Sequence, residues 1–165
     1  MAAGGWSSQD AAPRLLADVN GDGKEDVVGF GGAGVYVALA TGGGNFAAPT
    51  LASTLFGSDA AAGGWSSQNL FPRDVADING DNRDDIIGFG SAGTFVALGN
   101  ADGTFGPAQF DLMSFGTSAQ AGGWTSDSLY HRLAADVTGD GLADIIGFGG
   151  AGVYLAPAND FAFVP

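Results

Sequence analysis

Residues 18–30 read D-V-N-G-D-G-K-E-D-V-V-G-F, and closely related stretches occupy residues 77–89, D-I-N-G-D-N-R-D-D-I-I-G-F, and 136–148, D-V-T-G-D-G-L-A-D-I-I-G-F. Each stretch joins an acidic turn to a short apolar run. A run that is apolar at successive positions and rich in β-branched residues is typical of a strand buried on both faces. Three such strands in one chain predict a repeat architecture.

The repeat extends beyond these stretches. Trp6, Trp65 and Trp124 follow one another at steps of 59 residues, and the arginines 14, 73 and 132 keep the same step. We place the repeats at about residues 4–62, 63–121 and 122–165 of one segment that spans 1–165, with the third repeat truncated. A repeat this regular is stronger evidence for the architecture than the secondary-structure preference of any single residue.

Within a repeat, short β-branched and aromatic runs are separated by Gly, Asn and Asp, which predicts successive antiparallel strands. In the first repeat the runs are 14–18, 26–30 and 35–40, and a fourth strand is expected within 46–56, as within 105–115 of the second repeat. Four strands per repeat predict an all-β propeller with three four-stranded antiparallel blades. A β-sandwich or a β-solenoid with the same strand content is the alternative.

The acidic turns have the spacing of a calcium loop, because oxygen ligands at every second position of a tight turn can converge on one cation. The alternative is that these side chains only accept hydrogen bonds from the backbone of the turn. The predicted ligands of a structural Ca²⁺ are Asp18, Asn20, Asp22, Asp26, Asp77, Asn79, Asp81, Asp85, Asp136, Thr138, Asp140 and Asp144.

Composition excludes several classes of function. The net charge is -13 with only five Lys and Arg residues, whereas a nucleic-acid binder needs a basic surface. Cysteine is absent, and the single histidine, His131, stands where the other repeats have proline, so no repeated nucleophile and base are available. We therefore expect a binding protein and not an enzyme.

The strings G-G-W-S-S, P-R, A-D-V-N-G-D-G-K-E-D-V-V-G-F-G and A-G-V-Y-V resemble bacterial and fungal β-propeller lectins of the Photorhabdus lectin type, built of blades similar to the FG-GAP or VCBS blades of integrin α-chains. The lectin resemblance implies a multivalent carbohydrate-binding protein with pockets between blades, for fucose or a related monosaccharide. The integrin resemblance implies a calcium-loop scaffold for protein–protein interaction. Glycans are the expected partners under the first interpretation.

The repeated Trp and Arg are the expected sugar-binding residues. An exposed indole offers an apolar face to a pyranose ring, and a guanidinium offers several donors to its hydroxyls. Alternatively, the Trp is a wedge between blades and the Arg pairs with an Asp of the loop. The predicted site contains Trp6, Arg14, Trp65, Arg73, Trp124 and Arg132, with Ser7, Ser66 and Thr125 as weaker candidates.

Assembly follows from the number of blades. Closed propellers have typically four to eight blades, so three blades leave a ring open and two chains would supply six. We expect a homodimer that forms a six-bladed ring. The chain shows neither the basic region and apolar run of a signal peptide nor a membrane-spanning stretch, so we expect it to be soluble, and we leave secretion and action outside the cell open.

Overall fold

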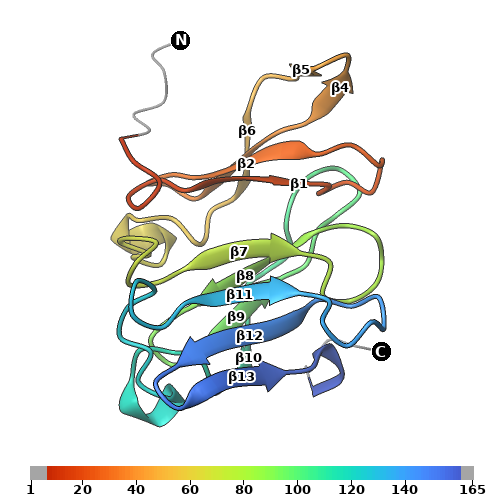
Figure 1. Ribbon diagram of the computed structural model, residues 1–165. Coiled ribbons are helices and arrows are strands. Elements are labelled where there is room, and N and C mark those ends of the chain that lie inside the picture. The colour runs from red at the N-terminus through yellow and green to blue at the C-terminus, as the bar shows by residue number, and fades with distance from the viewer. Residues whose placement is uncertain (1–6, 161–165) are drawn as a thin grey trace.

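The computed structural model describes residues 7–160, and its regular structure is β-strand apart from three 3-10 turns of three residues each (Figure 1). Blade 1 contains β1 (Arg14–Ala17), β2 (Asp26–Phe30), β3 (Val35–Ala38) and β6 (Thr50–Ser53). Blade 2 contains β7 (Arg73–Ala76), β8 (Asp85–Phe89), β9 (Thr94–Ala97) and β10 (Gln109–Leu112). Blade 3 contains β11 (Arg132–Ala135), β12 (Asp144–Gly149) and β13 (Gly152–Ala156). The prediction of an all-β propeller fold is confirmed, and the expected four strands are present in blades 1 and 2, whereas blade 3 has three strands within the described residues.

Strands within a blade are hydrogen-bonded in chain order, and every pair is antiparallel. The equivalent pairs keep the same register in the three blades: Arg14 lies opposite Gly29, Arg73 opposite Gly88, and Arg132 opposite Gly147. Alternate residues of a strand therefore point to the same face in every blade. One repeat of the sequence thus builds one blade.

The fourth strand is shorter than expected. β6 begins after Pro49 and ends before Phe56, whose φ of 57° is left-handed and turns the chain away from the sheet. Phe46, which we expected to begin this strand, pairs with Ala40 in a separate hairpin of β4 (Ala40–Gly42) and β5 (Asn45–Phe46). The shortening has a physical reason, because proline lacks the N–H that a strand interior uses.

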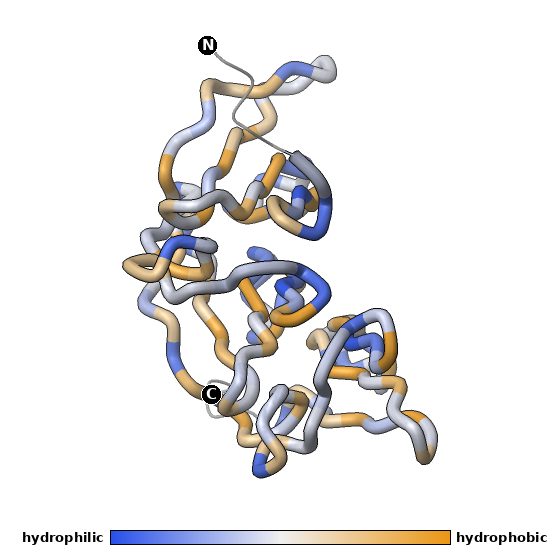
Figure 2. The backbone as a smooth tube through the Cα atoms, turned by 90° about the vertical axis from the view of Figure 1, so that its left-hand side faces the viewer, coloured by the Kyte–Doolittle hydropathy of each residue, from blue (hydrophilic) through white to orange (hydrophobic). Residues whose placement is uncertain are grey.

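The blades lie side by side in a curved row (Figure 2). Their first strands β1, β7 and β11 are neighbours, so the first strand of each blade lies on the inner side of the row. Two apolar cores fill the spaces between blades: Phe30 and Val37 of blade 1 face Ile86 of blade 2, and Phe89 of blade 2 faces Ile145 of blade 3. Burial of each such side chain contributes roughly 1.5–3 kcal/mol.

Two connections cross from one blade to the next. Each contains a 3-10 turn, η1 (Ala60–Ala62) or η2 (Ala119–Ala121), and a glycine with positive φ, Gly63 or Gly122, follows it. A third turn, η3 (Ala158–Asp160), follows β13. Because the tryptophans come two residues after these glycines, η1 and η2 position the indole rings at the junctions.

Candidate functional site: pockets between the blades

A pocket of about 460 Å³ lies at the junction of blades 1 and 2. We call it pocket A. Its walls include Phe56 and Trp65 from the connection between the blades, Phe95 from β9, and Ser91 with Ala92 from the turn before β9. This volume is within the roughly 300–1,000 Å³ that small-ligand sites occupy.

A second pocket, pocket B, lies at the junction of blades 2 and 3 and has a volume of about 470 Å³. Its residues Phe115, Trp124 and Tyr154 stand 59 positions after Phe56, Trp65 and Phe95. Tyr130 and Tyr154 replace Phe71 and Phe95, so pocket B carries two phenol groups where pocket A carries phenyl rings. The two pockets share these aromatic positions and differ in polarity.

Trp65 and Trp124 are each both a wall of a pocket and part of the packing. The Trp65 ring centroid lies 5.1 Å from that of Phe56 and 6.1 Å from that of Phe95. A Cβ atom on Gly88 would lie 2.6 Å from the indole, so this glycine lets the ring rest against β8. Trp124 is buried and Trp65 half-buried, and Trp6 lies outside the described residues. The wedge interpretation therefore holds alongside the pocket wall.

We expected the guanidinium groups of the repeated arginines to donate to sugar hydroxyls, but two of the three arginines are buried between blades. Arg73 is buried, its Nη1 donates to the carbonyl of Phe56 at 3.2 Å, and its guanidinium lies 5.3 Å from the ring centroid of Phe30. Burial lowers the pKa of Arg73 to about 10, which leaves the side chain charged at neutral pH. Arg132 repeats these contacts with Phe115 and Phe89, whereas Arg14 is exposed.

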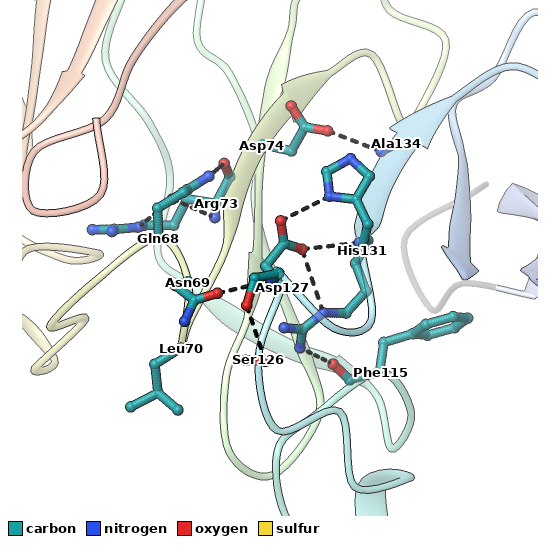
Figure 3. Close-up of polar contacts among 12 residues, drawn as sticks. Gln68, Asn69, Leu70, Arg73, Asp74, Phe115, Ser126, Asp127, His131 and Ala134 are labelled. Carbon is teal, nitrogen blue, oxygen red and sulfur yellow. Dashed lines mark hydrogen bonds and ion pairs between the residues drawn. The ribbon is translucent and has the colours of Figure 1, made fainter. Parts of the chain in front are cut away.

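Gln68 fixes the main chain of Arg73, as Figure 3 shows. Its amide oxygen accepts from the Arg73 N–H at 3.0 Å and its amide nitrogen donates to the Arg73 carbonyl at 2.6 Å. Asp127 takes the equivalent place in blade 3 and accepts from the Arg132 N–H and from His131. The partners Gln68 and Asp127 lie in the loops before β7 and β11, and not in the acidic turns. The predicted contact of the arginines with sugar stays a prediction.

A line of hydrogen bonds joins the three blades. The side chain and carbonyl of Asp10 accept from the N–H groups of Asn69 and Gln68, each at 2.7 Å. Asn69 in turn accepts from the N–H groups of Ser128 and Asp127, at 2.8 and 2.6 Å. We call these contacts the inter-blade staple. It holds together the loops that precede β1, β7 and β11.

The acidic loops are closed by hydrogen bonds to their own backbone. The two carboxylate oxygens of Asp18 accept from the N–H groups of Gly21, Asp22 and Gly23. Asp26 is buried and accepts from the N–H groups of Val19 and Ala40, and so links its loop to the start of β4, just after the third strand. The other loops repeat this pattern at Asp77 with Asp85 and at Asp136 with Asp144.

This geometry matches the turn-capping alternative. Among residues 7–160, no group of three or more Asp, Glu or His side chains is placed to hold a metal ion. Carboxylate oxygens that accept N–H groups keep a second lone pair, so these hydrogen bonds leave the same oxygens able to bind a cation. The calcium sites stay a prediction from the sequence.

Comparison with known proteins decides the family. Residues 18–87 and 77–147 each match the model of the FG-GAP-like repeat. The chain belongs to the FG-GAP-like repeat family. No curated protein matches this FG-GAP-like chain at a significant level.

Solved structures support the same assignment. An Agrocybe aegerita lectin, described for specific recognition of non-reducing terminal N-acetylglucosamine, is 41% identical with a TM-score of 0.79. The match covers 92% of the FG-GAP-like chain but 37% of the lectin, so the chain spans only part of that protein's length.

Two further solved structures share the fold at lower identity. A TcdB2-TccC3 structure is 19% identical over 91% of this chain and 7% of the other, with a TM-score of 0.66. The Tc holotoxin pore of Photorhabdus luminescens is 19% identical over 88% of this chain and 6% of the other, with a TM-score of 0.60. The comparisons together support a lectin-like repeat propeller, while the Photorhabdus lectin type stays a prediction.

Sequence reasoning missed most of the pocket walls. Phe56, Phe71 and Phe95 were not singled out, although each is aromatic again 59 residues later. Aromatic residues that recur at a fixed step outside the strands' buried face were the available signal. Ser66 and Thr125 are exposed and do not line the pockets, and Ser7 is exposed before blade 1. No helix in residues 7–160 has the length and apolar character to span a bilayer.

Proposed function

We propose that this FG-GAP-like chain is a multivalent lectin that binds one monosaccharide in each pocket between blades and carries out no catalysis. The observation that carries the proposal is the pair of equivalent Trp-walled pockets of about 460 and 470 Å³. Aromatic walls suit the apolar face of a pyranose, and two weak sites on one chain gain strength through avidity.

The sugar is proposed from two sources. The Agrocybe lectin recognises terminal N-acetylglucosamine, and the acetamido methyl group of that sugar would suit the aromatic walls of pocket A. Fucose is the alternative from the resemblance to propeller lectins. Tyr130 and Tyr154 add hydrogen-bonding groups to pocket B, so we expect pocket B to bind the more tightly of the two.

Blocking the pockets tests the proposal without disturbing the core. Ser91 is exposed at the rim of pocket A, and Gly150, at the equivalent place in pocket B, would carry a Cβ atom with ordinary contacts. We expect the S91F/G150F double variant to lose calorimetric binding of N-acetylglucosamine and fucose at an unchanged melting temperature. A control, Ser128→Ala, alters an exposed side chain away from both pockets. Binding of neither sugar by the unmodified chain would overturn the proposal.

The proposed assembly is a homodimer. Because three blades fall below the usual four to eight of a closed ring, two chains together would give six blades. Such a ring would contain six junctions between blades, of which four are pocket A or pocket B within the two chains.

A further inference from the structure

The outer face of blade 3 is apolar and exposed. Phe148, Val153 and Leu155 are 47%, 66% and 47% exposed, and Val137 beside them is 56% exposed. Their counterparts in blade 1, which are Phe30, Val35, Val37 and Val19, are at most 2% exposed because blade 2 covers them. Blade 3 therefore carries the same surface that blades 1 and 2 bury against a following blade.

Blade 1 carries the complementary surface. Leu16 is 61% exposed, and Phe46 and Arg14 are also exposed. The residues 59 positions later, Val75, Phe105 and Arg73, all pack against blade 1. This exposed face of blade 1, which we call the leading face, thus has the same kinds of residue as the face of blade 2 that packs on blade 1.

The internal junctions define how the two end faces would fit. Arg73 lies over Phe30 at 5.3 Å and Arg132 over Phe89 at 5.6 Å, so the next pair in this series is Arg14 over Phe148. Arg14 is already held like its counterpart, because its Nε donates to Gln9 at 2.8 Å as that of Arg73 does to Gln68. The main chain gives a second pair, since the N–H of Asp84 donates to Asp18 and that of Ala143 to Asp77.

We propose that the exposed face of blade 3 is covered by the leading face of blade 1 of a second copy, with the second copy's Arg14 stacked on Phe148. Its Glu25 N–H would donate to the carbonyl of Asp136, which continues the main-chain series. This inference rests on the proposed homodimer and specifies its contacts. The interface is head-to-tail, so it occurs twice when two copies close a ring.

Two variants that each disable one face test the pairing. Phe148→Asp places a charge on the exposed face of blade 3, which we call the trailing face, and Leu16→Asp places one on the leading face of blade 1. We expect the unmodified chain to show twice the 16.3 kDa mass of one chain by light scattering and each variant to show the mass of one chain. The control is Leu129→Asp, because Leu129 is exposed and so is its counterpart Leu70; this variant should stay dimeric.

Mixing the two variants identifies the geometry. A head-to-tail interface leaves one intact face on each variant, so an equimolar mixture of Phe148→Asp and Leu16→Asp should recover the dimer mass through a single junction. Failure of the mixture to associate would overturn the pairing, as would monomeric unmodified chain or a mass of three or more chains. Thermal melting of each variant shows that it is folded.

Sugar binding separates this inference from the lectin proposal. Pocket A contains no residue of blade 3, so a monomeric Phe148→Asp variant should bind the same sugar at pocket A with an unchanged Kd. Loss of assembly with retained sugar binding would support the interface and leave the lectin proposal intact. A dimer that passes the mixing test but binds neither sugar would instead refute the lectin proposal alone.

Discussion

The guanidinium of Arg73 lies 5.3 Å from the ring centroid of Phe30, and the two residues belong to different blades. The same arginine donates to the carbonyl of Phe56, a buried residue with a left-handed φ of 57°. A bulky residue takes this conformation at a cost, which the surrounding packing must offset. The arginine therefore joins the ring of one blade to the strained connection that leads to the next.

A double-mutant cycle measures this junction. Arg73→Met removes the charge and Phe30→Leu removes the ring, and we expect each to lower the free energy of unfolding by about 1–3 kcal/mol, because a desolvated cation–π contact and a bond from a charged donor are lost. The coupling energy should be about 1 kcal/mol or more. Urea denaturation gives these values, with Lys24→Met on the exposed acidic loop as the control. Strict additivity of the two changes would contradict the contact.

The sequence repeat explains which features of the fold could be predicted from the sequence. A step of 59 residues at the tryptophans and at the acidic turns predicted the blades, because equal sequences must satisfy equal surroundings. The surroundings of Arg73 and Trp65 could not be predicted from the repeat, because a repeated residue can face either a ligand or a neighbouring blade. Only the junction decides between them, and it depends on contacts between residues that are far apart in the chain, such as Arg73 and Phe30.

Gly88 gives a test of how tightly the indole is seated. An added Cβ would lie 2.6 Å from Trp65 and 2.7 Å from Phe56, so we expect Gly88→Ala to destabilise the chain by about 1–3 kcal/mol and to weaken sugar binding at pocket A. Gly106→Ala is the matched control, because its Cβ would meet its nearest neighbour at 3.6 Å. Chemical denaturation and calorimetry measure the two effects. Equal stability of the two variants would show that the ring moves freely.

Stability should fall as the pH rises through the neutral range. Burial raises the pKa of Asp85 from 3.8 to about 7, although bonds from Gly99 and Ile78 lower it. Between pH 3.8 and about pH 7, Asp85 therefore keeps its proton in the folded chain and has released it in the unfolded chain. The stability that this difference contributes is fully present below pH 3.8 and is lost as the pH rises to about 7. Burial raises the pKa of Asp26, Asp74 and Asp84 in the same direction.

Asp85→Asn isolates this effect, because asparagine is similar in shape and does not titrate. The melting temperature of the unmodified chain should be higher at about pH 5 than at about pH 8, and that of the variant should change less over the same range. Both are measured with a chelator present, so that bound calcium does not contribute. An equal pH dependence of the two chains would assign the effect to other carboxylates.

Calcium removal tests the acidic loops directly. If the predicted sites bind Ca²⁺ in the folded chain, a chelator lowers the melting temperature, and excess Ca²⁺ restores it by an amount set by RT ln(1 + [L]/Kd). Mg²⁺ at the same concentration is the control, because it needs stricter octahedral geometry. A melting temperature that ignores both chelator and calcium would show that hydrogen bonds such as those from Gly21 and Gly23 to Asp18 hold the loops alone.

Hydrogen exchange at the amides of the inter-blade staple can distinguish separation of two blades from unfolding of a sheet. The amides of Gln68 and Asn69 are protected by a partner in the preceding blade, and those of Asp127 and Ser128 by a partner in the blade before theirs. An amide within β8 exchanges with solvent only when its sheet opens, whereas these four exchange as soon as a junction parts. Their hydrogen-exchange rates would therefore report the opening of each junction separately, and a ligand seated in one pocket would slow exchange at the amides of that junction.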